Sequence, residues 1–196
     1  MIEKVVSDYL VVGAGAMGMA FTDVLMTETD ATVAIVDRHS HPGGHWNDSY
    51  PFVRLHQPSS FYGVNSRELG NDTKDLVGGN AGLYELASGT EVVTYFGQVM
   101  SQQFLPSGRV RYIPTSEYLG DGLIRDLISG IEVVVDAPKT VNATYMNVTV
   151  PAVTTPSYEV MEGVQCIPPN ELPSITNTPD GYVVIGGGKT AIDSCL

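Results

Sequence analysis

The sequence is poor in several kinds of residue, and each scarcity excludes a class of protein. Only 2 of its 196 residues are cysteine, at Cys166 and Cys195. They are too few and too widely spaced for a disulfide framework or a cysteine-based zinc site. Lysine and arginine together number 10 against 22 aspartates and glutamates, and the formal net charge is −12. A chain this acidic is a poor partner for nucleic acid or for an anionic membrane surface.

Other absences concern location and metal binding. No apolar run reaches the ~18 residues of a membrane-spanning segment, and the first residues lack the profile of a signal peptide. We therefore expect no integral membrane segment and a cytoplasmic protein. His39, His41 and His45 are closely spaced, but Pro42 and the glycines after it interrupt any helix that would hold them on one face, so no metal site is predicted.

The strongest positive pattern is a glycine-rich turn near the start of the chain. Apolar residues 9–12 run into Gly13-Ala14-Gly15-Ala16-Met17-Gly18, and a helix is predicted from Ala16 to about Thr27. Strand, glycine turn and helix in this order form the context that a dinucleotide-binding fingerprint requires. Gly13 permits a tight turn, Gly15 lets the backbone approach a pyrophosphate, and Gly18 lets the helix pack closely on the strand.

An acidic residue follows the next predicted strand. Ala31–Val36 is typical of a second parallel strand, and Asp37 comes directly after it. A carboxylate in this place accepts hydrogen bonds from the adenosine ribose and repels a 2′-phosphate. The alternative, a plain glycine turn followed by a solvated aspartate, is disfavoured because every element falls in register.

A long loop is predicted over Arg38–Pro58. It is rich in histidine, glycine, proline and aromatic residues, and long ordered loops of compact domains are usually functional. Gly43 and Gly44 permit close backbone approach, and Trp46 offers a flat surface. The alternative is a surface loop in which Trp46 serves only as a hydrophobic anchor.

The middle of the chain predicts one helix and several short strands. Ser88-Gly89-Thr90-Glu91 matches a capping box, and an apolar stripe continues to about Gln103. Short strands are predicted over Arg109–Ile113, Ile131–Val135 and Thr140–Tyr145. They indicate a small antiparallel sheet inserted at about 109–146. Six of the twelve prolines then fall in Pro151–Pro179, which predicts an extended crossover.

The opening pattern returns near the end of the chain. Tyr182–Ile185 predicts a buried strand, and Gly186-Gly187-Gly188-Lys189-Thr190-Ala191 predicts a second dinucleotide turn. A P-loop would need glycine at Val183, so a nucleoside triphosphatase is disfavoured. A Rossmann unit needs a further helix and strand after this turn, so we expect the chain to be the N-terminal part of a larger protein.

These elements predict an α/β fold. It comprises a Rossmann-like dinucleotide-binding βαβ unit with an inserted antiparallel β-meander, followed by the first strand of a second, truncated dinucleotide-binding domain. The expected divisions are a first dinucleotide-binding domain over 1–150, a proline-rich crossover over 151–181, and the start of a second dinucleotide-binding domain over 182–196; the resemblance described next implies FAD for the first and NAD(P) for the second.

Two dinucleotide turns with Gly-Gly-x-Trp after the first acid resemble the two-dinucleotide-binding flavoproteins, in particular the group of flavin-containing and Baeyer–Villiger monooxygenases. The resemblance implies FAD at the first turn, with Asp37 at the ribose and Arg38 beside the adenine. It further implies Gly44, His45 and Trp46 near the flavin, with Gln57 or, in reserve, His56 as the polar group close to the isoalloxazine. Gly186, Gly188 and Ala191 match the NADPH-side turn, where Lys189 and Thr190 would present amides to phosphate.

The resemblance implies an oxidoreductase in which NAD(P)H, with NADPH favoured, reduces bound FAD and the flavin then acts on oxygen or a small organic substrate. The motif Phe-x-Gly-x-x-x-His-x-x-x-Trp/Phe of the monooxygenases is absent, so a related FAD- and NAD(P)-dependent oxidoreductase fits equally well. A flavin-dependent disulfide reductase is disfavoured because no redox cysteine pair exists. An inactive nucleotide-binding fragment and a single-cofactor flavin oxidase remain alternatives. The substrate, the catalytic residues and the oligomeric state are not predicted.

Overall fold

A computed structural model describes residues 3–144, 152 and 154–196. Its central feature is a four-stranded parallel sheet in the order β4-β3-β2-β8. The strands are β4 (Val110–Ile113), β3 (Val33–Val36), β2 (Tyr9–Val12) and β8 (Lys139–Asn142). All three neighbouring pairs are parallel. The run of valine, isoleucine and leucine in β2 and β3 is what a parallel sheet covered on both faces requires.

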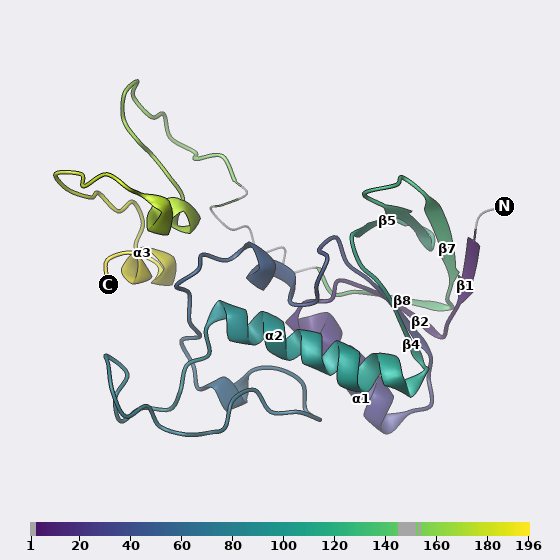
Figure 1. The fold of residues 1–196 in the computed structure, drawn as a ribbon. Helices are drawn as coiled ribbons and strands as arrows, with labels where there is room; N and C mark the ends of the chain where they lie inside the picture. The colour runs from purple at the N-terminus through teal and green to yellow at the C-terminus, as the bar shows by residue number, and fades with distance from the viewer. Residues whose placement is uncertain (1–2, 145–151, 153) are drawn as a thin grey trace.

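A second four-stranded sheet, in the order β1-β7-β6-β5, contributes a second core that contains Leu10 and Val36 of the parallel sheet. It consists of β1 (Glu3–Val6), β7 (Glu132–Asp136), β6 (Leu123–Asp126) and β5 (Ser116–Gly120). β1 pairs parallel with β7, whereas β5, β6 and β7 are antiparallel. Figure 1 shows this sheet at the same end of the molecule as β2, β4 and β8.

The antiparallel insertion is shorter than the expected 109–146. It runs from β5 to β7, and the two strands predicted at its ends, β4 and β8, belong to the parallel sheet. The alternation of side chains along a short strand does not specify which neighbour it pairs with, because that pairing depends on residues far away in the sequence. Tyr145, the last residue of the strand predicted at 140–145, lies outside the described residues, as does the boundary expected at 150.

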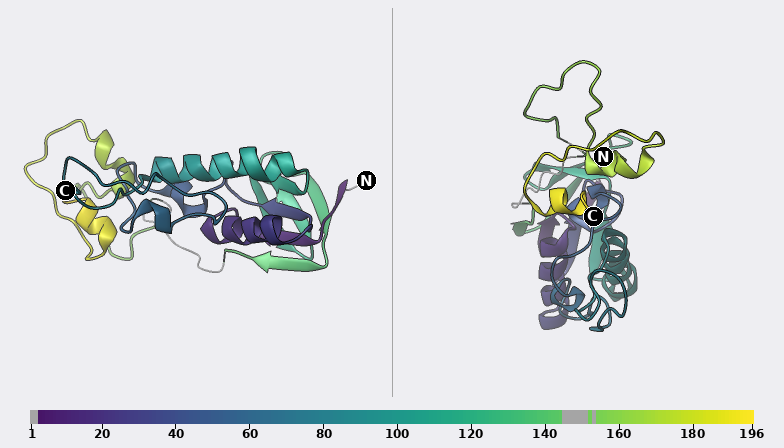
Figure 2. Two further views of the ribbon diagram at one scale, coloured as in Figure 1. Left: turned by 90° about the horizontal axis from the view of Figure 1, so that it is seen from below. Right: turned by 90° about the vertical axis from the view of Figure 1, so that its left-hand side faces the viewer.

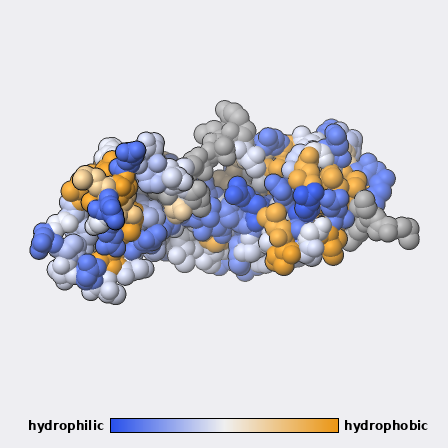
Figure 3. Space-filling model, turned by 90° about the horizontal axis from the view of Figure 1, so that it is seen from above, coloured by the Kyte–Doolittle hydropathy of each residue, from blue (hydrophilic) through white to orange (hydrophobic). Residues whose placement is uncertain are grey.

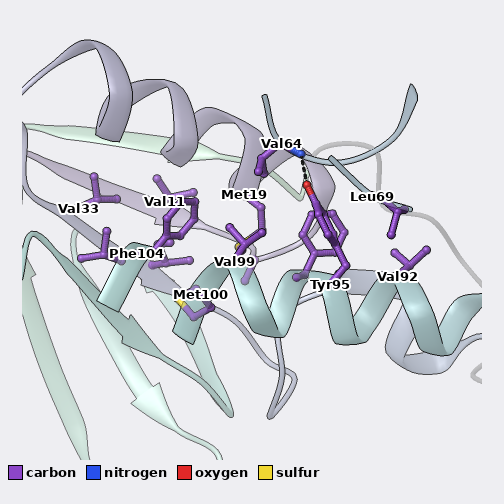
Figure 4. Close-up of a cluster of buried hydrophobic side chains, with 14 of the residues drawn as sticks. Val11, Met19, Val33, Val64, Leu69, Val92, Tyr95, Val99, Met100 and Phe104 are labelled. Atoms are coloured by element: carbon purple, nitrogen blue, oxygen red, sulfur yellow. Dashed lines mark hydrogen bonds between the residues drawn. The ribbon is translucent and has the colours of Figure 1, made fainter. Parts of the chain in front are cut away.

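Two helices, α1 (Ala16–Glu28) and α2 (Gly89–Val99), contribute to the main core on one face of the parallel sheet. α1 follows β2 directly, close to the predicted span. α2 continues without a break through a wider turn (η3, Met100–Phe104) and a tighter one (η4, Leu105–Ser107). Figure 4 shows the core that α2 builds with the sheet, in which Val92, Phe96 and Val99 are fully buried. The apolar stripe predicted on this helix is therefore confirmed as core.

The remaining described segments contain short helical turns and isolated β-bridges. η1 (Gly44–Asp48) and η2 (Ser59–Phe61) lie in the loop region after β3, while η6 (Pro169–Ser174) and α3 (Lys189–Asp193) lie near the end of the chain. Figures 1 and 2 show an elongated molecule in which α3 and the sheets lie at opposite ends. None of residues 154–196 is buried.

Candidate nucleotide-binding site

The first glycine turn connects β2 to α1. Two of its positions, Gly13 and Gly18, require glycine. Gly13 has φ of 104°, a value that side chains other than hydrogen rarely allow. Its N–H donates to the carbonyl of Val36 at 2.8 Å, which fixes the turn to the end of β3. A Cβ at Gly18 would lie 1.9 Å from the carbonyl oxygen of Gly13. The spacing therefore serves close packing of the helix on the turn, as predicted.

The N-terminus of α1 is open to an anionic ligand. Gly15 is its N-cap, so no side chain caps the helix, and the first turn contains no acidic residue. Met17 is 65% exposed and Ala16 is partly exposed. The first amides of an α-helix have no partner within the helix and lie at the positive end of its dipole. This arrangement suits a phosphate group.

The Gly43-Gly44 pair lies directly against this turn. The N–H of Gly43 donates to the carbonyl of Ala14 at 2.8 Å. Gly44 has φ of 56°, and a Cβ built on it would be 2.9 Å from the Cα of Gly15. The backbone of the loop after β3 therefore packs directly against the backbone of the first glycine turn, and glycines occupy the positions where the two segments touch.

Asp37 lies beside the turn, as the fingerprint predicts. Its side chain is almost fully buried, and its Oδ2 accepts the N–H of Ala14 at 2.6 Å. Its Oδ1 accepts the backbone N–H of His39 at 2.8 Å and lies 2.9 Å from the Nδ1 of that residue. Arg38 is exposed next to it. The acid that the sequence assigns to the ribose is thus held by both the glycine turn and the following loop.

His39 and Asp48 complete this cluster, and the sequence analysis did not find it. The Nε2 of His39 lies 2.9 Å from Oδ2 of Asp48. Hydrogen bonding to Asp37 raises the pKa of His39, burial opposes the rise, and Asp48 adds to it. Sequence reasoning considered His39 only as a metal ligand. Its position two residues after Asp37 was a usable signal, whereas its contact with Asp48 depends on the fold of the loop.

A buried hydroxyl on the neighbouring strand was also missed. Tyr112 lies on β4, paired with Ile35 of β3. Its hydroxyl is shielded from solvent and has no hydrogen-bond partner among the described residues. Burial, and then the charge of Asp37, raise the pKa of Tyr112. An unsatisfied buried hydroxyl that feels the charge of Asp37 is the kind of group that a polar ligand satisfies, so the residues present fit a nucleotide.

The residues that the resemblance places near the flavin divide into two groups, one packed on the main core and one at the surface. Trp46 donates its Nε1–H to the hydroxyl of Tyr62 at 2.7 Å and packs against the main core. Its ring stacks on His45 at 5.3 Å, and burial lowers the pKa of that histidine. The anchor interpretation of Trp46 therefore has direct structural support. His56 is exposed and Gln57 half-buried, and neither has a hydrogen bond to the first glycine turn among the described residues.

The strand predicted before the second glycine turn is not present. Tyr182–Ile185 is extended but pairs with no other described residue. Tyr182, Val183 and Ile185 are 63%, 91% and 65% exposed, so the expectation of a buried strand is wrong for this chain. A strand forms only beside a hydrogen-bonding neighbour, and the described residues supply none. Figure 3 shows hydrophobic atoms exposed at this end of the molecule.

The second glycine turn itself docks on the loop after the first. Gly186 has φ of 140°, and Gly188 is the N-cap of α3. Lys189 pairs with Asp193 in the same short helix. Asp193 also accepts a hydrogen bond from the hydroxyl of Tyr50 at 2.7 Å. Thr190 and Ala191 are partly exposed within α3. The structure therefore ties α3 to the loop that lines the first turn.

Four further observations limit what else the described residues do. A cavity of about 480 Å³ lies between α2 and residues 54–87, and none of its lining residues belongs to either glycine turn. No group of three or more histidine, cysteine or acidic residues is placed to hold a metal ion within the described part of the chain. None of the described helices is both long enough and apolar enough to cross a bilayer. Cys166 and Cys195 are free and exposed.

Comparison with known families places the first part of the chain. Residues 11–59, which contain the glycine turn, Asp37 and the Gly43-Gly44 loop, match the model of the NAD(P)-binding Rossmann-like domain. The fold is Rossmann-like. The match covers the segment in which β2 and β3 pair in parallel and are joined by the glycine turn and α1.

Relatives and solved structures were also compared. Proteins from Mycobacterium bovis and Mycobacterium tuberculosis are 57% identical over 194 residues, which is 99% of this chain and 36% of each relative. The chain thus spans about a third of the length of the curated relatives it matches.

The solved structures include flavin monooxygenases. An oxidized steroid monooxygenase bound to NADP has 23% identity and a TM-score of 0.49, covering 71% of this chain and 26% of that one. A flavin-containing monooxygenase from Stenotrophomonas maltophilia has 18% identity and a TM-score of 0.48, covering 71% and 38%. The Rossmann-like fold of this chain follows from its own strand order and from the family match over residues 11–59.

Proposed function

We propose that this chain binds FAD at the first glycine turn and is part of an oxidoreductase in which NAD(P)H, with NADPH favoured, reduces the flavin. The observation that carries the proposal is the open N-terminus of α1 beside a buried carboxylate. Amides of Gly15, Ala16 and Met17 would hold the diphosphate, and Asp37 would accept a ribose hydroxyl. Bound flavin would supply hydride acceptance, and the protein would supply orientation and exclusion of water.

The second glycine turn is proposed to receive the nicotinamide nucleotide. Gly186, Gly188 and Ala191 have the spacing, and the contact of Tyr50 with Asp193 keeps the turn beside the loop of the first site. The exposed, unpaired Tyr182–Ile185 favours a second candidate for this chain alone, a protein that binds one nucleotide and does not catalyse electron transfer. Monooxygenation of a small organic substrate is the finer proposal for the whole protein.

The test of FAD binding uses a charge placed at the site. Titration of the purified chain with FAD, followed by flavin fluorescence, is expected to show saturable binding. Met17→Glu should weaken it at least about tenfold, because a carboxylate at the first turn repels the diphosphate while favouring the helix dipole. Val24→Glu introduces the same charge two turns along α1, where Val24 is 43% exposed, and should leave binding unchanged.

Two outcomes decide between the candidates. If the wild-type chain binds no FAD, or if Met17→Glu and wild type bind equally, the first site is not a dinucleotide site. If FAD binds but NADPH added without oxygen leaves the visible flavin band intact, the chain has a single working nucleotide site. Bleaching of the band by NADPH supports electron transfer between the two turns.

A further inference from the structure

His39 lies between two carboxylates, and the geometry fixes its protonation. Nδ1 is 2.9 Å from Oδ1 of Asp37, and Nε2 is 2.9 Å from Oδ2 of Asp48. An ionised carboxylate only accepts hydrogen bonds, and a neutral imidazole has a single N–H. Both contacts are hydrogen bonds only if both ring nitrogens are protonated. Between two ionised carboxylates, this geometry therefore favours the imidazolium form of His39.

The surroundings of the cluster keep these charges partly out of water. The exposed fractions of the side chains are 19% for His39, 5% for Asp37 and 33% for Asp48. Two further titratable groups face the cluster from neighbouring elements. His45 on η1 interacts with both His39 and Asp48, and Tyr112 on β4 interacts with Asp37. Within the triad itself, the imidazolium reduces the charge of two carboxylates from −2 to −1.

The hydrogen bonds of Asp37 leave one place for a ligand. Each carboxylate oxygen accepts about two hydrogen bonds. Oδ1 takes the backbone N–H and the ring N–H of His39, so it is filled. Oδ2 takes the N–H of Ala14 and keeps one free acceptor position. The clamp therefore orients the carboxylate with its remaining acceptor on the oxygen next to the glycine turn.

We propose that His39 is the positioning residue of the nucleotide site, orienting Asp37 for one ribose hydroxyl and lowering the negative charge that a bound diphosphate meets. The inference rests on the proposed binding of FAD at this turn. Loss of one ring proton leaves a single N–H, which can serve only one of the two carboxylates, and it restores a charge of −2 near the diphosphate. Both effects weaken binding, so affinity should fall as pH rises through the elevated pKa of His39, and binding below that pH range should be strongest.

The first experiment measures the dissociation constant of FAD for the full chain between about pH 6 and pH 9. The wild-type dissociation constant is expected to rise about tenfold over this range, because a tenfold change corresponds to the loss of about one charge-assisted hydrogen bond. His39→Gln should bind weakly at every pH and meet the wild-type curve at the alkaline end. His41→Gln is the matched control, since His41 is exposed and its ring contacts only Ser40. It should follow the wild-type curve.

A second variant separates charge from shape. Asp48→Asn preserves the side-chain outline and leaves an amide oxygen that still accepts from Nε2, but it removes one negative charge. The pKa of His39 falls, so the midpoint of the FAD pH profile should shift down by roughly one unit, with affinity at low pH retained. Thermal unfolding of each variant shows whether a loss of binding is a loss of fold. An unshifted midpoint in a folded Asp48→Asn protein overturns the proposal.

Nuclear magnetic resonance of the imidazole nitrogens distinguishes the failure of this inference from that of FAD binding. Without ligand at neutral pH, both ring nitrogens of His39 should be protonated. FAD binding with a neutral His39, or with equal pH profiles for wild type and His39→Gln, overturns the positioning role alone. A protonated His39 in a chain that binds no FAD refutes the nucleotide site and with it the positioning role.

Discussion

Single glycines set how closely α1 approaches the turn that precedes it. Gly18 has no room for even one methyl group, because the carbonyl oxygen of Gly13 occupies the place where a Cβ would lie. Gly97 on α2 is the opposite case, with helical backbone and no atom within 4 Å of a built Cβ. The two positions therefore differ in whether glycine serves packing or is only tolerated.

Gly18→Ala and Gly97→Ala should change stability in opposite directions. The first forces α1 away from β2 and should destabilise the protein by about 2–3 kcal/mol, in the range of overpacked cores. The second should stabilise it by up to about 1 kcal/mol, since alanine restricts the unfolded chain. Urea unfolding followed by circular dichroism measures both. Equal effects of the two substitutions would contradict the close packing of α1 on the turn.

Residue positions were predictable where they follow from local spacing. Gly13, Gly18 and Asp37 lie where a strand–turn–helix–strand pattern requires them, and the structure brings them together. His39 and Tyr112 were not predicted because their partners come from other segments. Asp48 reaches His39 only after the loop folds into η1, and the position of Tyr112 depends on β4 joining the parallel sheet.

The start of α2 is fixed by a complete capping box at Ser88. Its Oγ accepts the N–H of Glu91 at 3.3 Å, and Oε2 of Glu91 accepts the N–H of Ser88 at 2.7 Å. The hydrogen bonds that Oε2 of Glu91 accepts from the N–H and from the hydroxyl of Ser88 lower the pKa of Glu91. Two helix-end amides are thus satisfied reciprocally. Since α2 carries much of the main core, its N-terminal boundary affects how the whole face is covered.

Ser88→Ala should destabilise the protein by about 1 kcal/mol near neutral pH. A carboxyl group with a lowered pKa stabilises the fold above its unfolded pKa and loses that contribution as pH falls. The difference between wild type and Ser88→Ala should therefore shrink below about pH 4. Denaturant unfolding at several pH values measures it. Thr94→Ala, an exposed position in the middle of α2, is the control and should be neutral or slightly stabilising. A difference that stays constant with pH would argue against the role of Glu91.

Elements were predictable when their signals were local, and pairing was not. α1, the start of α2 and the approximate positions of β4, β7 and β8 follow from periodicity, the capping box and turn residues. The assignment of β4 and β8 to the parallel sheet, and the lack of pairing at Tyr182–Ile185, depend on which strands are available as neighbours. An apolar run predicts the capacity to form a strand, whereas its formation requires a partner.

At the scale of the whole molecule, stability is unevenly distributed. Both hydrophobic cores consist entirely of residues before position 144, and none of residues 154–196 is buried. The hydrogen bonds between the C-terminal segment and the loop after β3 include one from Tyr50 to Asp193 and one from Asn170 to the carbonyl of Asp48. A five-residue helix such as α3 is marginal without such contacts. The segment should therefore open independently of the cores.

Tyr50→Phe tests this division. Burial and the hydrogen bond to Asp193 raise the pKa of Tyr50 to about 12, so its hydroxyl remains a donor across the neutral range. Removing it should speed amide hydrogen exchange in residues 189–195 about tenfold, the equivalent of one hydrogen bond, while the cores keep their protection. Tyr9→Phe removes a hydroxyl that receives a hydrogen bond from Lys139 at the other end of the molecule, and should leave this exchange unchanged. If Tyr50→Phe left the rate of amide hydrogen exchange in α3 unchanged, or lowered protection in α3 and in both cores equally, the second glycine turn would not be held by this contact.

Independent opening of this segment matters for function, because the proposed electron transfer needs the second glycine turn to stay beside the loop that contacts the first. A chain in which that loop and α3 separate freely would bind FAD yet fail to bring NADPH to it.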